Sequence, residues 1–474
     1  MQGRHDERDR AGGGPVRDGH DERDRARRQA EEALLEPPFP HTAAPPPRRL
    51  LANRPFAWLV ASYGVSQLGF WAFFLAILGQ TGFEYHAGAF QLGILFSSFS
   101  ISFLLLTAPL GQVCDRWSPK WMVVAGQVVA IGSVVPAMVG HSVGWLYAAS
   151  VIDGVAAAAA IPARASLTAL LVETEDLVRA NGTMNTASMF AVIFGPVVSG
   201  YLVKSFGHRS AYWFILAVIG AGLVLLFPIA DRRPRGSSEN SFRGDLADGF
   251  RVSWRHPELR ALLLLAGSAW FLITVLITLE PLFVKQVLHR RIDSLGILWS
   301  AHGVGAFLGA VAVTRMKRAG GREVLLLGVA LLVGSGGLLV YVGTPLFGVA
   351  IVGNAIFGVS FAWFVSLSQA LIQRVTAEDM RGRVTGVVGM LQESSSLACA
   401  LGISALAGVI AAVQPYLIGS AVSMSAFGFY GLRAGRAFRR SAPADPVATA
   451  DATIIADSAI TAPPAPAPAP VDRA

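Results

Sequence analysis

The sequence predicts an all-α polytopic membrane protein whose twelve transmembrane helices form two six-helix pseudo-repeats. Hydrophobic residues make up 53% of the 474 residues and charged residues only 15%, which is too apolar for a soluble protein of this length. The stretch LGILFS at 92–97 returns as LGILWS at 295–300, and a longer stretch beginning at Gly154 returns from Gly358. Both matches share an offset of about 203 residues, which indicates duplicated halves.

Apolar runs of about 20 residues, the length that an α-helix needs to cross a bilayer, predict each span in turn. Charged or turn-rich breaks separate them. The first six runs lie at 57–80, 90–112, 121–140, 143–165, 186–204 and 211–230, and the second six at 259–284, 293–314, 323–342, 345–372, 384–411 and 414–432. The shortest breaks, after Gly140 and Gly343, occupy the same place in the two halves.

Composition divides the chain into five parts. We expect a disordered N-tail at 1–50, a six-helix bundle at 51–230, a linker at 231–258, a second bundle at 259–435 and a disordered Pro/Ala-rich tail at 436–474. In the linker, Phe242, Leu246, Phe250 and Trp254 recur at a spacing of four, which predicts an amphipathic helix at a membrane surface.

Arginine and lysine gather in the loops on one side of the predicted membrane. That side has Arg116, Lys120, Arg164, Arg179, the arginines from Arg232 to Arg255, Arg315 to Arg322 and Arg374 to Arg383. By the positive-inside rule this side is cytoplasmic, and an even number of spans places both termini there. The net charge of +8 therefore reflects topology, and we expect no nucleic-acid partner.

The turn after the second span, PLGQVCDRWSPK, carries Gly111, Asp115, Arg116 and Lys120 at the spacing G-x-x-x-D-R-x-x-x-K. It resembles the loop signature of the major facilitator superfamily, with Ser118 and Pro119 departing from the usual pattern. The resemblance implies that this loop gates the cytoplasmic side. A turn whose charges only set topology is the alternative.

Two further motifs resemble exporters of that superfamily. GPVVSG in the fifth span, with Gly195, Pro196 and Gly200, is similar to the glycine-proline motif of its drug:proton antiporters, although helix packing alone also favours such residues. The linker sequence FRGDLADGFRVSWRHPELRALL resembles the subgroup of enterobactin exporters and macrolide efflux proteins.

Ionisable residues inside spans are functional candidates because burying them in a bilayer is costly. Asp153 in the fourth span, Glu393 in the eleventh and His302 in the eighth qualify. Desolvation favours the protonated form of a carboxyl group, which suits a group that exchanges protons as access alternates. The polar residues Gln67 and Gln392 are further substrate or coupling candidates. Hydrogen bonding to a neighbouring helix is the alternative for each.

Other groups receive a structural interpretation. Glu280 lies near the outer end of the seventh span, where we expect it at the rim in contact with water. Cys114 and Cys399 fall at or inside spans and indicate packing. Aromatic residues such as Phe70, Phe73 and Trp270 either line an apolar cavity or, more commonly, pack.

Together these features predict a secondary transporter rather than an enzyme, because no nucleotide-binding loop, zinc-protease motif or nucleophile elbow is present. We expect no cofactor and no metal. The resemblance implies a monomeric, multi-pass protein that is surrounded by the lipid bilayer of the bacterial inner membrane. It also implies export of a partly hydrophobic organic compound, such as a drug or a siderophore, with protons as the coupling ion. An importer with the same fold and a transport-dead membrane sensor remain open.

Overall fold

The computed structural model describes residues 50–173, 176–231, 242–315, 322–376, 378–409 and 412–441. The predicted tails lie almost entirely outside these ranges. The chain divides into a first unit, Met1–Ala52, of which only the helical turn Leu50–Ala52 is described, and a second unit, Asn53–Ala474, which holds every longer element. All that follows concerns this second unit.

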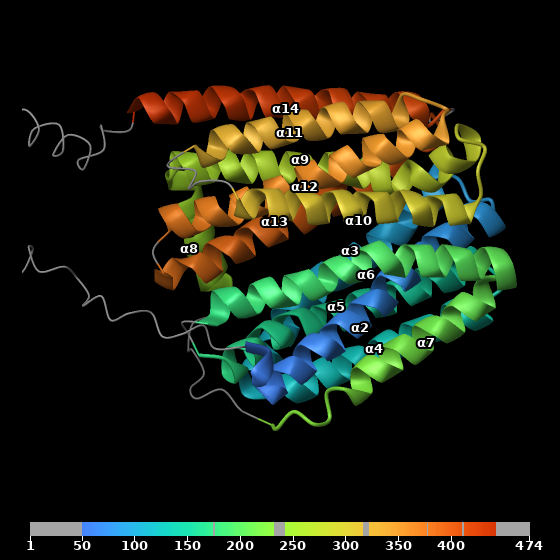
Figure 1. The fold of residues 1–474 in the computed structure, drawn as a ribbon, viewed down its shortest axis with the longest axis horizontal. Helices are drawn as coiled ribbons and strands as arrows, with labels where there is room; N and C mark the ends of the chain where they lie inside the picture. Colours follow the sequence, from blue (N-terminus) through green and yellow to red (C-terminus); the bar gives the residue numbers. More distant parts are fainter. Residues whose placement is uncertain are drawn as a thin grey trace, which may run out of the picture. The chain divides into compact units, whose positions relative to one another are not determined.

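The regular elements of the described residues are helices, and twelve of them occupy the twelve predicted spans (Figure 1). The first six are α2 (Arg54–Gly79), α3 (Ala89–Arg116), α4 (Pro119–Val139), α5 (Val143–Leu171), α6 (Leu177–Phe206) and α7 (His208–Val224). The second six are α9 (Pro257–Gln286), α10 (Ile292–Thr314), α11 (Glu323–Val342), α12 (Phe347–Val375), α13 (Glu378–Ala405) and α14 (Gln414–Ser441). A π-helical turn, η2 (Gln80–Glu84), follows α2.

Ten of these helices are long and apolar enough to cross a membrane, and α7 is a shorter apolar helix among the described residues. α14 continues beyond its apolar run into residues that include Arg433 and Arg436. Several helices also extend past the predicted spans: α6 begins at Leu177, not near residue 186, and α5 ends at Leu171. A helix continues outside the apolar layer because its backbone hydrogen bonds are satisfied within the segment.

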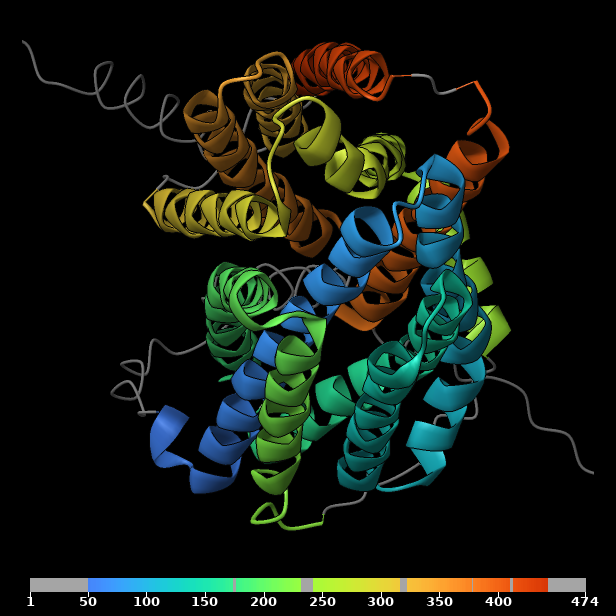
Figure 2. The ribbon, with the colours of Figure 1, turned by 90° about the vertical axis from the view of Figure 1, so that its right-hand side faces the viewer.

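The two groups of six pack in the same way, as a duplication requires. In the first group α2 packs on α6 and α7, and α5 packs on α3 and α4. The corresponding pairs of the second group recur: α9 packs on α13 and α14, and α12 packs on α10 and α11. Figure 2 shows the two groups end on, with α2 to α7 in blue and green and α9 to α14 in yellow to red.

The two most extensive helix contacts between the groups are those of α6 with α10 and of α3 with α13. They are equivalent under the repeat, since α3 corresponds to α10 and α6 to α13. We call the end where α3 gives way to α4 the basic end, and the other the opposite end. Figure 1 places the basic end on the left.

The linker contains α8 (Phe242–Arg255), which packs on α13 and α9 of the second group. Gly249 allows this approach, because a Cβ there would lie 2.8 Å from the carbonyl oxygen of Arg383. The rings of Phe250 and Trp254 stack with centroids 5.7 Å apart and are exposed. An amphipathic helix thus lies at the basic end with its aromatic face uncovered.

Candidate functional site

A cavity of about 970 Å³ lies between the two groups of helices. Most of its lining comes from α2, α4, α5 and α6, and α12 contributes residues of the second group between Val365 and Gln373. The segments that line it run from mid-helix to the basic end, where α5 and α12 end and α6 begins. The cavity therefore extends from the middle of the molecule toward the basic end.

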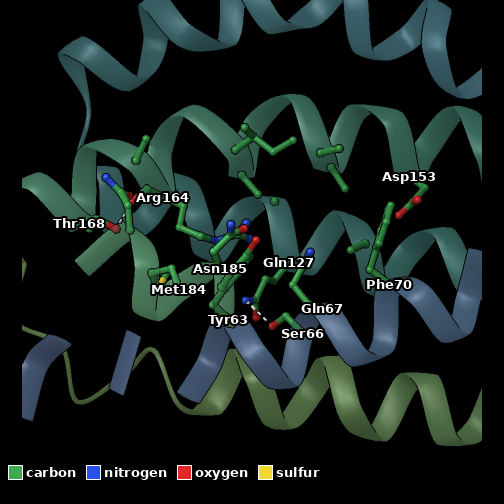
Figure 3. A pocket seen from close by; sticks show the side chains of 18 of the residues that line it. Tyr63, Ser66, Gln67, Phe70, Gln127, Asp153, Arg164, Thr168, Met184 and Asn185 are labelled. Atoms are coloured by element: carbon green, nitrogen blue, oxygen red, sulfur yellow. Dashed lines mark hydrogen bonds between the residues drawn. The ribbon is translucent and has the colours of Figure 1, made fainter. Parts of the chain in front are cut away.

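Amide and hydroxyl groups line much of this cavity. Gln127 donates to the hydroxyl of Ser66 at 2.8 Å, and Gln67 donates to that of Ser188 at 3.3 Å. Figure 3 shows Tyr63, Gln67, Gln127 and Asn185 grouped in the middle of the pocket. The remaining uncharged polar lining residues are Thr168, Asn181, Ser366, Gln369 and Gln373, and the apolar ones include Phe70, Phe73, Phe99, Ala156, Ala157, Ala160 and Met184. Such a mixture suits an organic molecule that is partly hydrophobic.

The structure places two of the predicted residues, Asp153 and Gln67, in the cavity wall. Asp153 lies on α5 and is 8% exposed. Among the described residues its carboxylate has no hydrogen-bond or ion-pair partner. Figure 3 shows it beside Phe70, at the end of the pocket away from Arg164. An ionisable group buried without a protein partner is available to a ligand or a proton.

Arg164 corrects the interpretation of the basic loops, because it lies inside α5 and lines the cavity rather than belonging to a loop. Its guanidinium carbon lies 4.3 Å from the centroid of the Tyr63 ring on α2. The apolar run predicts a span that ends near residue 165, whereas α5 continues to Leu171. Of the residues that the structure describes, the cavity wall thus holds one carboxylate and one guanidinium.

At the opposite end the two groups are in close contact. Gly93 of α3 meets α13, where a Cβ would lie 2.6 Å from the carbonyl oxygen of Ala400. Gly79 faces the side chain of Ile292 in the same way. Lys204 and Asp293 form an ion pair of 2.8 Å between α6 and α10. These contacts close the cavity at the opposite end.

A cluster of aromatic rings joins the two groups between the cavity and the closed end. Trp299 of α10 lies 5.8 Å from Trp71 and 5.3 Å from Phe74, both on α2, between ring centroids. Phe96 of α3 packs edge-on against Phe74 at 5.4 Å. We call Trp71, Phe74, Phe96 and Trp299 the aromatic cluster.

Glu280 supports this cluster, and its expected place at a wet rim is wrong. It is 2% exposed and accepts hydrogen bonds from Trp299 Nε1 at 2.7 Å and from the hydroxyl of Tyr341 at 2.5 Å. Depth along α9 alone predicts exposure, but α10 and α11 cover this side chain. The two donors satisfy a buried carboxyl group and fix the Trp299 ring.

The other predicted candidates lie outside the cavity wall. Gln392 and Glu393 are half-buried on α13, where the neighbouring Ser396 accepts a hydrogen bond from Thr274 at 3.0 Å. His302 packs within the second group, with its ring centroid 5.3 Å from that of Phe357. Their proposed roles in coupling stay predictions.

The predicted gating signature contributes mainly to the first group. Gly111 lies in α3, and the side chains of Asp115 and Arg116 are outside what the structure describes. Lys120 is 7% exposed and donates to the backbone carbonyl of Phe227, at 3.1 Å, and to that of Ile229. The Lys120 ammonium group thus supplies hydrogen bonds to backbone carbonyls just after the end of α7, which lack a partner within the helix.

The glycine-proline motif lies on the part of α6 that contacts α2 of the first group and α10 of the second. A Cβ on Gly195 would be 2.9 Å from the carbonyl oxygen of Leu68 on α2. Gly200 faces Ile292 and Asp293 of the second group. A Cβ on Gly296 of α10 would lie 2.6 Å from the carbonyl oxygen of Pro196. Small residues therefore bring α6 against α2 and α10.

Metal-ligand clusters are absent from the described residues, and Cys114 and Cys399 are both buried.

Comparison with known proteins identifies the family. The chain is 23% identical to an uncharacterized MFS-type transporter, YfiS, of Bacillus subtilis (strain 168), over 74% of this chain and 86% of that protein. It is 27% identical to the enterobactin exporter EntS of Salmonella typhi, over 67% of this chain and 76% of EntS. The lysophospholipid transporter LplT of Photorhabdus laumondii subsp. laumondii is 27% identical over 52% of this chain and 61% of LplT.

Solved structures share the fold at low sequence identity. A bacterial homolog of the human lysosomal transporter Spinster, inward-facing and unoccupied, superposes with a TM-score of 0.63 at 16% identity, covering 84% of this chain and all of that one. The nucleoside transporter NupG gives 0.57 at 15% identity, over 81% of this chain and 98% of its own. The model of the Major Facilitator Superfamily matches residues 59–403. With twelve helices in two repeats around a central cavity, the chain belongs to the Major Facilitator Superfamily.

Proposed function

We propose that this transporter exports a partly hydrophobic organic compound in exchange for protons, by alternating access. The observation that carries the proposal is Asp153, a buried carboxylate without a protein partner among the described residues, in the wall of a cavity between two repeated bundles. A carboxyl group that faces each side in turn takes up a proton from one solution and releases it to the other. The mixed apolar and amide lining supports a compound of intermediate polarity.

The basic end is proposed to be cytoplasmic, with both termini, by the positive-inside rule. In the inner membrane of a bacterium the cavity is then open to the cytoplasm. An exporter binds its substrate in this state. Export is further supported by the relatives, since EntS is an enterobactin exporter and Multidrug resistance protein 1 of Bacillus subtilis (strain 168) is 24% identical over 44% of this chain. We propose that a monomer is sufficient, because the cavity lies within one chain.

The test is transport into everted membrane vesicles of a panel of siderophore-like and drug-like fluorescent compounds, with and without a proton gradient. Under this proposal, wild-type vesicles accumulate at least one compound, and a protonophore abolishes the accumulation. Asp153→Asn reduces gradient-driven accumulation at least tenfold, yet retains exchange of labelled for unlabelled compound across the membrane. The substitution removes the proton-carrying group and leaves the binding cavity in place.

Asp248→Asn is the matched control, because Asp248 lies on α8 outside the cavity, where it pairs with Arg251. Glu393→Gln tests the second candidate carboxylate in the same assay. Accumulation that needs no proton gradient would refute proton coupling. Compound driven out of everted vesicles would indicate import and refute the proposed direction.

A further inference from the structure

Arg164 is a cation in the cavity for which the described residues provide no counter-charge. Its guanidinium stacks on Tyr63 at 4.3 Å and forms no ion pair with a described carboxylate. Two other arginines at the basic end are paired: Arg374 pairs with Glu323 at 3.1 Å and also with Glu258, and Arg179 pairs with Asp176 at 3.3 Å. The cavity arginine differs from these in lacking an acid.

The side chain of Tyr63 satisfies only part of this guanidinium. A stacked aromatic ring interacts with the flat face of the group. The five N–H donors lie in the guanidinium plane, in a fork that matches the two oxygens of a carboxylate or a phosphate. A charge inside a spanning segment is costly when unpaired. A ligand anion in the cavity would supply the missing partner.

Asp153 lies too far along α5 to serve as the anionic partner of Arg164. The two residues are eleven positions apart, which is about 16 Å along a helix, and about 20° apart around its axis. Both side chains therefore point to the same face of α5, toward opposite ends of one pocket, as Figure 3 shows. An anionic group at Arg164 is consequently held away from the carboxylate that would repel it.

The wall between these two charges suits an uncharged body. Ala156, Ala157 and Ala160 of α5 are small and line the cavity there, and Phe70 lies at the Asp153 end. Uncharged amide donors at the basic end come from the second turn of α6, at Asn181, and the last turn of α12, at Gln373. The cation thus lies at the basic end with two amide groups, and Phe70 lies beside Asp153 at the other end, with Gln67, Gln127 and Asn185 between them.

We propose that the cavity binds an amphiphilic organic anion, with a carboxylate, sulfonate or phosphate group on Arg164 and an apolar body directed toward Phe70. This inference rests on the proposed transport function and defines its substrate class. Binding in this orientation bridges both bundles, since Arg164 belongs to α5 and Gln373 to α12. Such a ligand couples occupancy of the cavity to the relative position of the two halves.

The test uses three forms of one probe: a naphthyl-alkyl carboxylic acid at neutral pH, its primary amide and the corresponding primary amine. Binding to the purified full-length protein in a non-ionic detergent is measured by calorimetry. Wild type is expected to bind the carboxylate at least tenfold more tightly than the amide, and the amine most weakly. Arg164→Gln should bind carboxylate and amide alike while keeping wild-type affinity for the amide.

Arg164→Lys and Arg179→Gln complete the design. Lysine keeps the charge without the planar fork, so a smaller preference for the carboxylate should remain. Arg179 is exposed and already paired, so Arg179→Gln should match wild type. Competition by a short-chain anionic phospholipid, compared with competition by the free carboxylate, shows whether the anion comes from a lipid headgroup or from a soluble compound.

The outcomes separate this inference from the transport proposal. Equal wild-type affinity for all three forms, or a preference for the amine, would overturn the anion site even if the compounds are transported. An unchanged carboxylate preference in Arg164→Gln would overturn the role of this residue. Vesicles that transport the amide as well as the carboxylate would leave export standing and the anion site refuted.

Discussion

Glu280 shows how a single buried side chain connects the two halves of the transporter. Its carboxyl group receives hydrogen bonds from Trp299 and Tyr341, and the Trp299 ring packs on Trp71 and Phe74 of the other bundle. Glu280 belongs to the second bundle, yet through Trp299 it determines the position of rings that close the cavity from the opposite end. It is a positioning residue rather than a ligand.

Glu280→Ala should therefore lower the free energy of unfolding by about 3 kcal/mol, because two buried donors lose their acceptor. The loss is read from a thermal or denaturant unfolding curve of the purified protein. Glu280→Gln keeps an acceptor oxygen and should lose less. Equal stability of Glu280→Ala and wild type would contradict the supporting role of these hydrogen bonds.

The candidate site is predictable from sequence only in part. Asp153 and Gln67 are predicted because a polar residue in an apolar run is conspicuous, and the structure places both in the cavity wall. Arg164 and Gln127 are not among the predicted site residues, although each interrupts an apolar stretch in the same way. The apolar run ends close to Arg164, which favours a loop there, and no periodicity shows that a helix continues beyond its apolar part.

At the scale of helices, close backbone contacts at glycine determine which elements move together. Gly358 faces the backbone of His302 and ties α10 to α12 within one bundle, whereas Gly93 faces α13 across the two bundles. The motif at Gly195 and Gly200 combines both kinds of contact on α6. Glycines between bundles are the positions where added volume should change the conformation rather than the fold.

Gly93→Ala should weaken closure at the opposite end, because its Cβ would lie 2.2 Å from Ser404 Oγ and 2.6 Å from the carbonyl oxygen of Ala400. We expect a larger fraction of molecules open at that end, measured as faster labelling of a cavity cysteine from that side. Gly132→Ala is the matched control, since a Cβ on Gly132 meets no neighbour within 4 Å. Identical labelling in the two variants would argue against this contact as part of the closure.

For the whole molecule, the architecture is predictable from sequence because its determinants are local and repeated. Apolar length gives the spans, and the offset of about 203 residues gives the two halves. Closure of the cavity at the opposite end is not predictable in this way. It depends on contacts between residues that lie in different halves, such as Gly79 and Ile292. Which way the cavity opens is a property of the assembled bundles.

Alternating access requires that one cavity, lined by Asp153 and Arg164, opens in turn to the two sides of the membrane. The most direct test places a single cysteine at Ala157, a lining residue, after Cys114 and Cys399 are replaced, and applies an impermeant maleimide to oriented vesicles from either side. We expect labelling from the basic side at rest, and labelling from the opposite side once substrate and a proton gradient are supplied. Labelling from the same side under every condition would contradict alternating access through this cavity.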